Sequence, residues 1–558
     1  MTSYTLTVLD VTSIQGYIFG SNRVAENIGA SQLVHNATTC WVRTSLPAGR
    51  HNLRDDPETS IDPSRQLELG HSLDAEVILR GGGNVLILFR TEEIAKQSVG
   101  KLTRRLIEEA PGLELAAAHY EFVWDNKPIG GNEGVHRNLY QKLNQAKQQR
   151  QRSAPMLGLG VTLECRSIGQ PAVGFAPSQG SDDTTLRPAS AEVLAKLAHR
   201  EDAYCRFERI FKDVAAGYTF RREFGALGGT EGEMSYIAVV HADGNGMGKR
   251  FEEVVKAYAQ PTQNRVCLNA LRALSEAVDQ AGQTALKATV RRLTERFESP
   301  DADQAIKNFL QSLQYERETG KPILPFRPIV YGGDDVTFVC DGRLGLALAR
   351  IYLEEWELAT AADATIGAAH ACAGVAVVKA HYPFVRAYEL ADALCAGAKH
   401  AIRAARRDNP RLDDATALDW HFATSGIGGT ISQIREREYK GTAGALHLRP
   451  VGLSPGLLGP RWYYWDTFDK VTRTLQSDPC WRDRRNKVKE LREVLREGPL
   501  AVEQFRRAFI LRELPELDGS RQNLQRTGWD GSHCGYFDAI EALDFYLPLT
   551  DLPQKKEG

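Results

Sequence analysis

The feature that most restricts the fold of this chain is an order of strands and helices that occurs twice. In the first half, a strand ending at Asp10 precedes a helical segment, two strands joined by a glycine turn, a helix, a strand and a last helix. In the second half, a strand ending at Asp243 precedes a helix, an inserted helix-rich stretch, a glycine hairpin at 326–340, a helix, a strand and a closing helix. Strands are recognised by runs of apolar and β-branched residues, and helices by apolar residues three or four positions apart. Each half therefore predicts the β-α-β-β-α-β order of a ferredoxin-like domain with one more helix.

Two local matches support a duplication. Residues 81–85 (GGGNV) align with 332–336 (GGDDV), and the Ala-Lys pair at 146–147 aligns with that at 398–399 at nearly the same spacing. A chain of 558 residues is also too long for one core. We predict an α+β protein with two ferredoxin-like domains, inserted helical segments and a C-terminal helical domain. The expected parts are a first domain at 1–152, a linker domain at 153–232, a second domain at 233–430 and a helical domain at 431–558.

Composition places the chain among ordinary globular proteins. Hydrophobic residues make up 42% of it and charged residues 25%, and the net charge is −2, so any nucleic-acid contact depends on local basic patches. No apolar run approaches the roughly 18 residues of a membrane span, and the N-terminal residues do not read as a signal peptide. The nine cysteines are scattered, and Cys165 and Cys205 lack partners at zinc-ligand spacing. We therefore expect a reduced, cytoplasmic protein with no structural zinc and no membrane partner.

Three aspartates meet at one predicted edge of the second domain. In a β-α-β-β order, the end of the first strand and the turn of the hairpin are neighbours, so Asp243 is expected beside Asp334 and Asp335. Converging carboxylates repel one another unless a cation neutralises them, and hard oxygen ligands suit Mg²⁺ or Mn²⁺. Two such ions can activate an attacking hydroxyl and stabilise a pyrophosphate leaving group. The alternative is a structural turn, for which Gly-Asp and Asp-Gly are common dipeptides.

Glycines and basic residues surround these aspartates. The hairpin glycines keep the turn free of Cβ atoms, so a nucleotide can approach the backbone. The segment DGNGMG leads into a helix whose N-terminal amides can hold phosphate oxygens, and a lysine with an arginine one turn later on the closing helix can reach a triphosphate. Taken singly, these residues are hairpin, helix-cap and solvated surface residues. The candidate nucleotide-binding residues are Gly244, Asn245, Gly246, Gly248, Gly332, Gly333, Lys399 and Arg403.

These motifs resemble those of a known family. The second half contains HADGNGMGK, FRPIVYGGDDVTFV, AGVAVVKAHYP and ALCAGAKHAIR, and the first contains DVTSIQGYIFGSNRVAENIGASQLV and GGGNVLILF. Together with LGLGVTLECRSIGQPAVGF and ALDWHF, they are similar to the large palm-domain subunit of type III CRISPR effector complexes, which is related to diguanylate cyclases, over about residues 1–430. The resemblance implies two palm domains of the nucleotidyl cyclase type, one of them catalytic, that join ATP into cyclic or linear oligoadenylate second messengers in antiviral defence. It also implies that Asp243, Asp334 and Asp335 hold the metals and that Lys399 contacts the triphosphate.

The chain also departs from that family. Its first half keeps Asp10 but has Gly83 and Asn84 in place of the aspartate pair, so we interpret it as a degenerate palm that packs on the active one and is a candidate to hold an acceptor nucleotide. The family's His-Asp nuclease domain and four-cysteine zinc site are not expected here, and the helical domain matches only in architecture.

The last helix of the first half predicts a phosphate or RNA contact or, alternatively, a solvated face. It contains no acid and has Arg137, Lys142, Lys147, Arg150 and Arg152.

The leading functional hypothesis is a metal-dependent nucleotidyltransferase that converts ATP or another nucleoside triphosphate into oligonucleotide messengers. No protein base is evident, because His241 is interpreted as a strand residue. The alternative is a non-catalytic, nucleotide-binding scaffold subunit of an RNA-guided CRISPR complex, and a third hypothesis is a cyclase that makes a cyclic mononucleotide. The expected partners are nucleoside triphosphates and RNA or other complex subunits, in a homo- or hetero-oligomer.

Overall fold

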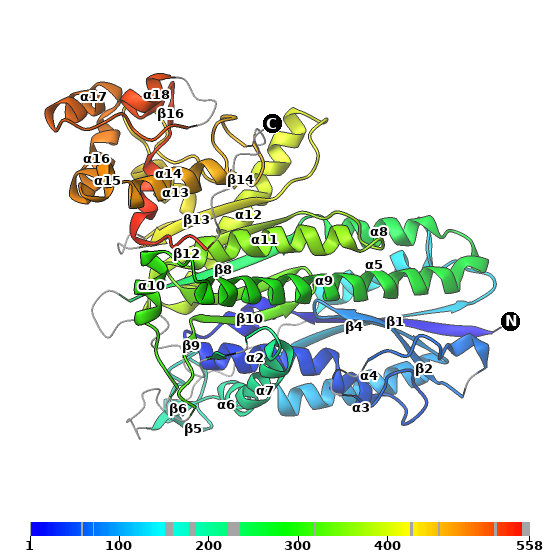
Figure 1. Cartoon of the computed structure of the whole chain (residues 1–558). Coiled ribbons are helices and arrows are strands. Elements are labelled where there is room, and N and C mark those ends of the chain that lie inside the picture. The colour runs from blue at the N-terminus through cyan, green and yellow to red at the C-terminus, as the bar shows by residue number, and fades with distance from the viewer. Residues whose placement is uncertain are drawn as a thin grey trace.

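A computed structural model shows two palm domains and a helical C-terminal part (Figure 1). In that view the first palm, blue to cyan, lies below the second, green to yellow, and the helical part, orange to red, lies above the second. Among the described helices, none is long and apolar enough to cross a membrane. The residues that the structure describes are 2–56, 58, 60–70, 72–150, 160–177, 186–215, 217–220, 235–316, 319–423, 428–455, 458–517 and 522–549.

The first palm is built on a four-stranded sheet with the order β2-β3-β1-β4. The central strand β1 is antiparallel to β3 and β4 and is apolar on both faces because helices cover both: Leu6 and Val8 belong to the core beneath α5, and Leu9 and Val11 to the core beneath α2 and α4. The elements are β1 (Ser3–Thr12), α1 (Ile14–Phe19), α2 (Val24–Thr38), α3 (Cys40–Ser45), η1 (Leu67–Leu69), β2 (Ala75–Gly81), β3 (Asn84–Phe89), α4 (Glu92–Glu109), β4 (Glu114–Val123) and α5 (Val135–Gln149).

The second palm repeats this order and extends it. Its six-stranded sheet runs β10-β11-β8-β12-β13-β14, and the first four of these strands correspond to β2-β3-β1-β4. Both hairpins have a register shift at the same place, between Val77 and Leu79 in the first palm and between Pro328 and Val330 in the second. The common topology and the common bulge confirm the predicted repeat. The elements are β8 (Tyr236–Gly244), α8 (Met247–Ala257), η2 (Pro261–Gln263), α9 (Asn264–Glu298), α10 (Gln304–Gln311), β9 (Ile323–Leu324), β10 (Phe326–Gly332), β11 (Asp335–Asp341), α11 (Gly345–Ala362), β12 (Ala371–Lys379) and α12 (Phe384–Asp408).

A further strand joins the second palm to the C-terminal part. β13 (Ala417–Ala423) is parallel to β12, and the short β14 (Val451–Gly452) pairs with β13. The segment ALDWHF is therefore a fifth strand, which the ferredoxin-like order does not predict. Trp420 of β13 packs against Phe468 of α14 (Trp465–Ser477) with ring centroids 4.8 Å apart, so the palm and the helical part share one core.

The C-terminal part is mostly helical, as predicted. Its buried Arg449 lies between Glu541, at 2.8 Å, and Asp538, at 3.5 Å, so the buried cation is paired. Its elements are α13 (Ile431–Glu438), α14 (Trp465–Ser477), α15 (Pro479–Arg482), α16 (Arg485–Glu497), α17 (Pro499–Ala508), α18 (Gln522–Thr527), β15 (Trp529–Asp530), β16 (His533–Cys534), α19 (Phe537–Glu541) and η3 (Ala542–Asp544).

The described residues of the predicted linker pack against both palms. α6 and α7 lie on α2 of the first palm, and β7 pairs in parallel with β9 of the second. A buried ion pair of 2.5 Å between Arg187 and Glu26 holds the linker to α2. The elements are β5 (Gly174–Pro177), β6 (Leu186–Ala189), α6 (Ala191–Ala198), α7 (Arg200–Phe211) and β7 (Thr219–Phe220).

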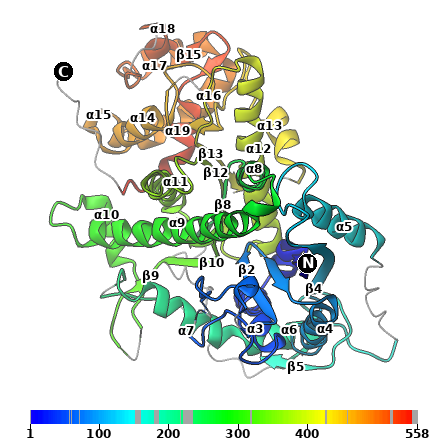
Figure 2. The ribbon, with the colours of Figure 1, turned by 90° about the vertical axis from the view of Figure 1, so that its right-hand side faces the viewer.

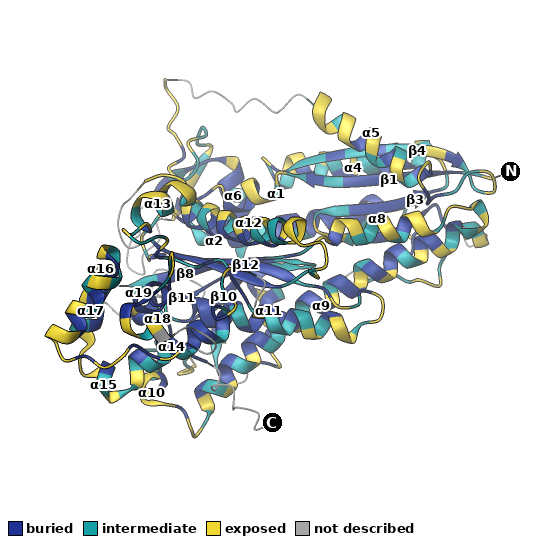
Figure 3. Ribbon diagram, turned by 90° about the horizontal axis from the view of Figure 1, so that it is seen from above, coloured by how far each residue is buried: buried dark blue, intermediate teal, exposed yellow. Residues whose placement is uncertain are grey.

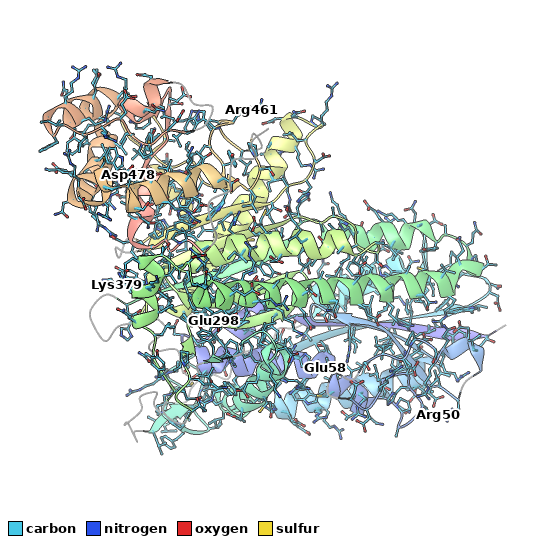
Figure 4. The ribbon with its side chains drawn as sticks, viewed as in Figure 1. Arg50, Glu58, Glu298, Lys379, Arg461 and Asp478 are labelled. Atoms are coloured by element: carbon cyan, nitrogen blue, oxygen red, sulfur yellow. The ribbon has the colours of Figure 1, made fainter. Side chains whose placement is uncertain are left out.

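Each palm packs one of its helices against a strand of the other palm. α2 of the first palm packs on β10 of the second (Figure 1), and α9 of the second palm packs on β2 of the first (Figure 2). Phe19 of α1 stacks on Tyr388 of α12, with ring centroids 3.7 Å apart. The strands of both sheets are largely buried (Figure 3), whereas charged side chains such as Arg50, Glu298 and Arg461 lie on the outside (Figure 4). The relative position of the palms is therefore fixed by shared cores rather than by a peripheral contact.

Candidate active site

The first strand and the hairpin of the second palm bring the three aspartates together. β8 pairs with β11 so that Asp243 lies directly opposite Asp335. Asp334 is the turn residue before β11, and its carbonyl oxygen accepts a hydrogen bond of 3.1 Å from the N–H of Gly244. Because directly paired residues project to the same face of a sheet, Asp243 and Asp335 share one face. The three carboxyls are neighbours at one end of the sheet.

Glycines allow the close approach of these segments. At Gly333 φ is +71°, a left-handed conformation that residues with a Cβ rarely adopt. At Gly244 a Cβ would lie 2.8 Å from Cβ of Asp334, so a larger residue would displace the hairpin. The two glycine motifs are thus needed for the geometry of the strand ends.

Two of the aspartates hold their protons more tightly than usual. Burial, followed by the charge of Asp243, raises the pKa of Asp334 to about 6 and that of Asp335 to about 7. The side chain of Asp335 is 38% exposed, and water moderates the effect there. Its buried Oδ1 accepts no hydrogen bond from the described residues. A cation beside these carboxyls would favour their ionised forms.

Lys399 of α12 already supplies one positive charge. Its ammonium group donates to Oδ2 of Asp243 and, at 2.8 Å, to the carbonyl oxygen of Gly244, and only 12% of its side chain is exposed. Arg403, one turn further along α12, is exposed. The structure therefore brings Lys399 to the aspartates and leaves Arg403 at the surface.

The loop after β8 is tied to the neighbouring strands. The N–H of Asn245 donates to the carbonyl oxygen of His370 at 2.8 Å, and its side-chain amide donates to the carbonyl oxygen of Ala415 at 2.9 Å. Gly246, with φ of +67°, is the N-cap of α8, and Gly248 lies in its first turn. Asn245 therefore anchors the loop through its side chain, and the backbone of the 246–248 segment leads into the helix.

His241 is a buried strand residue, as interpreted from the sequence. Its Nδ1 lies 3.1 Å from Oγ1 of Thr337 on the paired strand, and burial lowers its pKa. Its Nε2 lies 3.5 Å from Asp392 of α12, an acidic neighbour of the site that the sequence motifs did not indicate.

A cavity of about 820 Å³ lies between the palms next to these aspartates. Both glycine hairpins line it, as do α5, α8 and α9. Of the sequence-predicted residues, Gly248, Gly333 and Asp334 are among its lining, and Asn84 lines it from the first palm. Ser275 and Asp279 of α9 also line it and were missed, because the inserted stretch carries no recognisable motif. One signal was present: Gly282 is a glycine inside a helix, which marks a close backbone approach.

The first palm has the same framework with fewer charges. Asp10 pairs directly with Asn84 across β1 and β3, as Asp243 pairs with Asp335. Lys147 of α5 lies 2.7 Å from Oδ1 of Asp10, in the arrangement of Lys399 and Asp243. The first palm thus keeps one carboxylate and its lysine and lacks the pair of acids at the hairpin.

The cations of α5 are largely engaged within the protein. Lys147 pairs with Asp10, and Arg150 lies 3.6 Å from Glu114. Lys142 lies over the ring of Tyr120, with its ammonium nitrogen 4.9 Å from the ring centroid. The helix therefore has paired as well as solvated basic groups, and Arg152 lies outside the described residues.

The residues at the strand ends fit a divalent cation by the chemistry of their donors. In the described part of the chain, no group of three or more His, Cys, Asp or Glu side chains is arranged as it stands to hold a metal ion. However, the carboxyls of Asp243, Asp334 and Asp335 are hard oxygen donors on adjacent segments, and one buried oxygen of Asp335 has no hydrogen-bond partner. The site therefore has a suitable donor set, with Lys399 bound to one of its members.

Residues 236–408 match the family model described as Cas10/Cmr2, second palm domain. This match confirms, for the second palm, the resemblance to the palm-domain subunit of type III CRISPR complexes. No curated protein matches the chain.

Solved structures are similar to this chain at low identity. A chain of the apo Csm1-Csm4 cassette is similar with a TM-score of 0.50 and 12% identity, over 96% of this chain and 69% of that one. The cassette in complex with cA4 gives a TM-score of 0.49 and 12% identity over 97% and 69%, and the cassette in complex with one ATP gives 0.49 and 11% over 98% and 70%. At this identity the likeness concerns the fold alone.

Proposed function

We propose that this chain is a metal-dependent nucleotidyltransferase that converts ATP, or another nucleoside triphosphate, into cyclic or linear oligonucleotide second messengers for antiviral defence. The observation that carries the proposal is the direct pairing of Asp243 with Asp335, with Asp334 at the adjacent turn, within the segment that matches the second palm domain of Cas10/Cmr2. Asp334 and both hairpins face a cavity whose volume lies within the roughly 300–1,000 Å³ of small-molecule sites.

In this proposal, the carboxyls of Asp243, Asp334 and Asp335 hold two Mg²⁺ or Mn²⁺ ions. When bound, such ions lower the pKa of the attacking 3′-hydroxyl and stabilise charge on the α-phosphate and the pyrophosphate leaving group. The chain supplies orientation: the glycine turns let the phosphates approach the backbone, and the N-terminal amides of α8 donate to phosphate oxygens.

Lys399 exchanges partners in the proposed reaction. Its ammonium group is bound to Asp243 in the ligand-free protein and keeps that carboxylate paired. If a cation took its place on Asp243, Lys399 would be free to donate to the triphosphate. Arg403, exposed one turn away, is the second candidate for this contact.

The first palm is the proposed holder of the acceptor nucleotide. Its hairpin carries Asn84 opposite Asp10, and neither position offers the pair of acids needed for two ions. Gly82 and Asn84 nevertheless line the same cavity as Asp334. A nucleotide on the first palm would therefore face one on the second.

The proposal is tested with purified protein, ATP and Mg²⁺ or Mn²⁺. We expect pyrophosphate release and new oligonucleotides by mass spectrometry, and loss of both in the double variant Asp334→Ala/Asp335→Ala. Glu389→Ala, which removes an exposed acid from α12, is the matched control. RNA and complex partners are added in a second series, since the family resemblance makes subunits of an RNA-guided complex the proposed partners.

Each of the other outcomes contradicts the site assignment or supports a different function. Synthesis that survives the double variant contradicts the site assignment. ATP binding without product in every series supports the non-catalytic scaffold, and a cyclic mononucleotide as product supports the simple cyclase.

A further inference from the structure

The long helix α9 belongs to both palms. Cys267, Leu268 and Leu271, near its N-terminus, are part of the core of the first palm. From Leu274 onward its buried apolar residues are part of the core of the second palm. Figures 1 and 2 both show α9 running along the boundary between the palms.

Ion pairs fix the N-terminal half of α9 to the first palm. Arg272 donates to Oε1 of the fully buried Glu76 at 2.9 Å and to the carbonyl oxygen of Ile78 at 3.2 Å. Arg265 pairs with the same glutamate at 2.7 Å. Because Glu76 and Ile78 belong to β2, the helix is attached to the strand that leads into the first hairpin.

Two side chains one turn apart on α9 then contact the two hairpins. Oγ of Ser275 donates to the carbonyl oxygen of Arg80, just before the first glycine turn, at 3.4 Å. Oδ1 of Asp279 accepts from the N–H of Gly333, in the second glycine turn, at 3.1 Å. Ser275 and Asp279 both line the cavity between the palms.

The contact with the second hairpin is close as well as polar. Gly282 lies about one turn after Asp279 on α9. A Cβ at Gly282 would lie 2.1 Å from the carbonyl oxygen of Gly333. Gln283 donates to Oδ2 of Asp279 at 2.9 Å, which orients the carboxylate toward the turn. Gly333 is thus held at its N–H by Asp279, and the helix backbone closely approaches its carbonyl oxygen.

We propose that α9 sets the distance between the two hairpins, and that Asp279 is a positioning residue that holds the turn preceding Asp334 in place for nucleotidyl transfer. This inference rests on the proposed function for its catalytic consequence. A hairpin tip has few backbone hydrogen bonds of its own, and Gly333 lies next to two of the predicted metal ligands. A shift of about 1 Å in such a group can cost about 100-fold in rate.

Hydrogen–deuterium exchange followed by mass spectrometry tests the positioning without any assay of activity. In Asp279→Ala we expect at least fivefold faster exchange in the peptide that contains Gly333, because its N–H loses its acceptor. Asp279→Asn keeps an acceptor oxygen and is expected to retain wild-type protection. Glu295→Ala removes an exposed acid from the same helix and is the matched control.

Kinetics test the catalytic consequence. Asp279→Ala is expected to lower kcat about 10- to 100-fold with KM for ATP within threefold of wild type, and Asp279→Asn to restore kcat to within threefold. If Asp279→Ala does not fold, Asp279→Ser replaces it, since its shorter side chain stays polar but does not reach Gly333.

The results separate this inference from the proposed function. Unchanged exchange at Gly333 in Asp279→Ala overturns the positioning role, whatever the activity. An Asp279→Asn variant as inactive as Asp279→Ala also overturns it, since the negative charge rather than the acceptor would then matter. If the wild type makes no product, the exchange data alone decide on the positioning, and the proposed function fails separately.

Discussion

Lys147 lies 2.7 Å from Asp10 at the strand end of the first palm, in the position that Lys399 and Asp243 occupy in the second. The pair is therefore present in a domain whose hairpin has Gly83 and Asn84 in place of two acids. A lysine that served only to bind a triphosphate at a two-metal site would have no reason to keep this arrangement in the first palm. We infer that the pair also stabilises each palm, by neutralising a carboxylate where the strand meets the last helix.

Replacing Lys147 with methionine tests the structural role of this pair. Asp10, whose side chain is only 15% exposed, would lose its cation. We expect the free energy of unfolding to fall by about 1–3 kcal/mol, measured by thermal and urea denaturation. Lys96→Met, which breaks an exposed pair within α4, should cost no more than about 0.5 kcal/mol. Adding Asp10→Asn to Lys147→Met should recover part of the loss, and an additive double variant would contradict a direct interaction.

The raised pKa values of Asp334 and Asp335 predict a pH-dependent stability. Unfolded, these carboxyls ionise near pH 4, whereas in the fold they keep their protons to about pH 6 and about 7. The folded state thus binds more protons in this window, so the stability of the metal-free protein falls as the pH rises from about 4 to 7.

Thermal unfolding at pH 5 and pH 8 measures this effect. Asp334→Asn/Asp335→Asn should be more stable than wild type at pH 8, by a margin that shrinks at pH 5. Asp483→Asn, at an exposed position of the helical part, is the control and should show no such trend. If the difference in stability between the double variant and wild type does not change with pH, burial and the charge of Asp243 do not raise the pKa values of the two carboxyls in the folded protein.

Divalent cations should stabilise the folded protein through the same carboxyls. A ligand that binds only the folded state at 100 times its Kd adds about 2.7 kcal/mol. We expect Mn²⁺ to raise Tm at pH 8, to raise it less at pH 5 because protons compete for the carboxyls, and to have no effect on Asp334→Asn/Asp335→Asn. Asp10→Asn should respond as wild type does. A full response in the double variant would place the cation elsewhere.

The sequence was sufficient for the part of the site that depends on local pattern. Strand periodicity and the order of elements place Asp243 next to the hairpin, and the pairing of Asp243 with Asp335 is what that order requires. The hairpin glycines identified the turn because their role there is local: φ is positive at Gly333.

What the sequence did not show depends on contacts between distant segments. The sequence indicates α9 only as part of an inserted helix-rich stretch and assigns it no role. In the structure, Asp279 contacts Gly333, 54 positions away, and Arg272 contacts Glu76, 196 positions away. Helical periodicity reports which face is buried, but not which domain buries it. In the same way, the sequence does not indicate that the side-chain amide of Asn245, a predicted nucleotide-binding residue, donates to the carbonyl oxygen of Ala415.

Two glycine-to-alanine changes separate close contact within the protein from approach by a ligand. At Gly244 the added Cβ would lie 2.8 Å from Asp334, so we expect Gly244→Ala to displace the hairpin, to cost about 1–3 kcal/mol and to abolish synthesis.

At Gly248 the added Cβ meets nothing within 4 Å, and alanine inside α8 should stabilise the ligand-free protein by up to about 1 kcal/mol. Yet Gly248 lines the cavity at the start of that helix, so a phosphate held there would collide with the new methyl group. Gly248→Ala should therefore raise Tm while weakening ATP binding at least tenfold by calorimetry, and unchanged ATP affinity would show that the triphosphate does not rest on the first turn of α8.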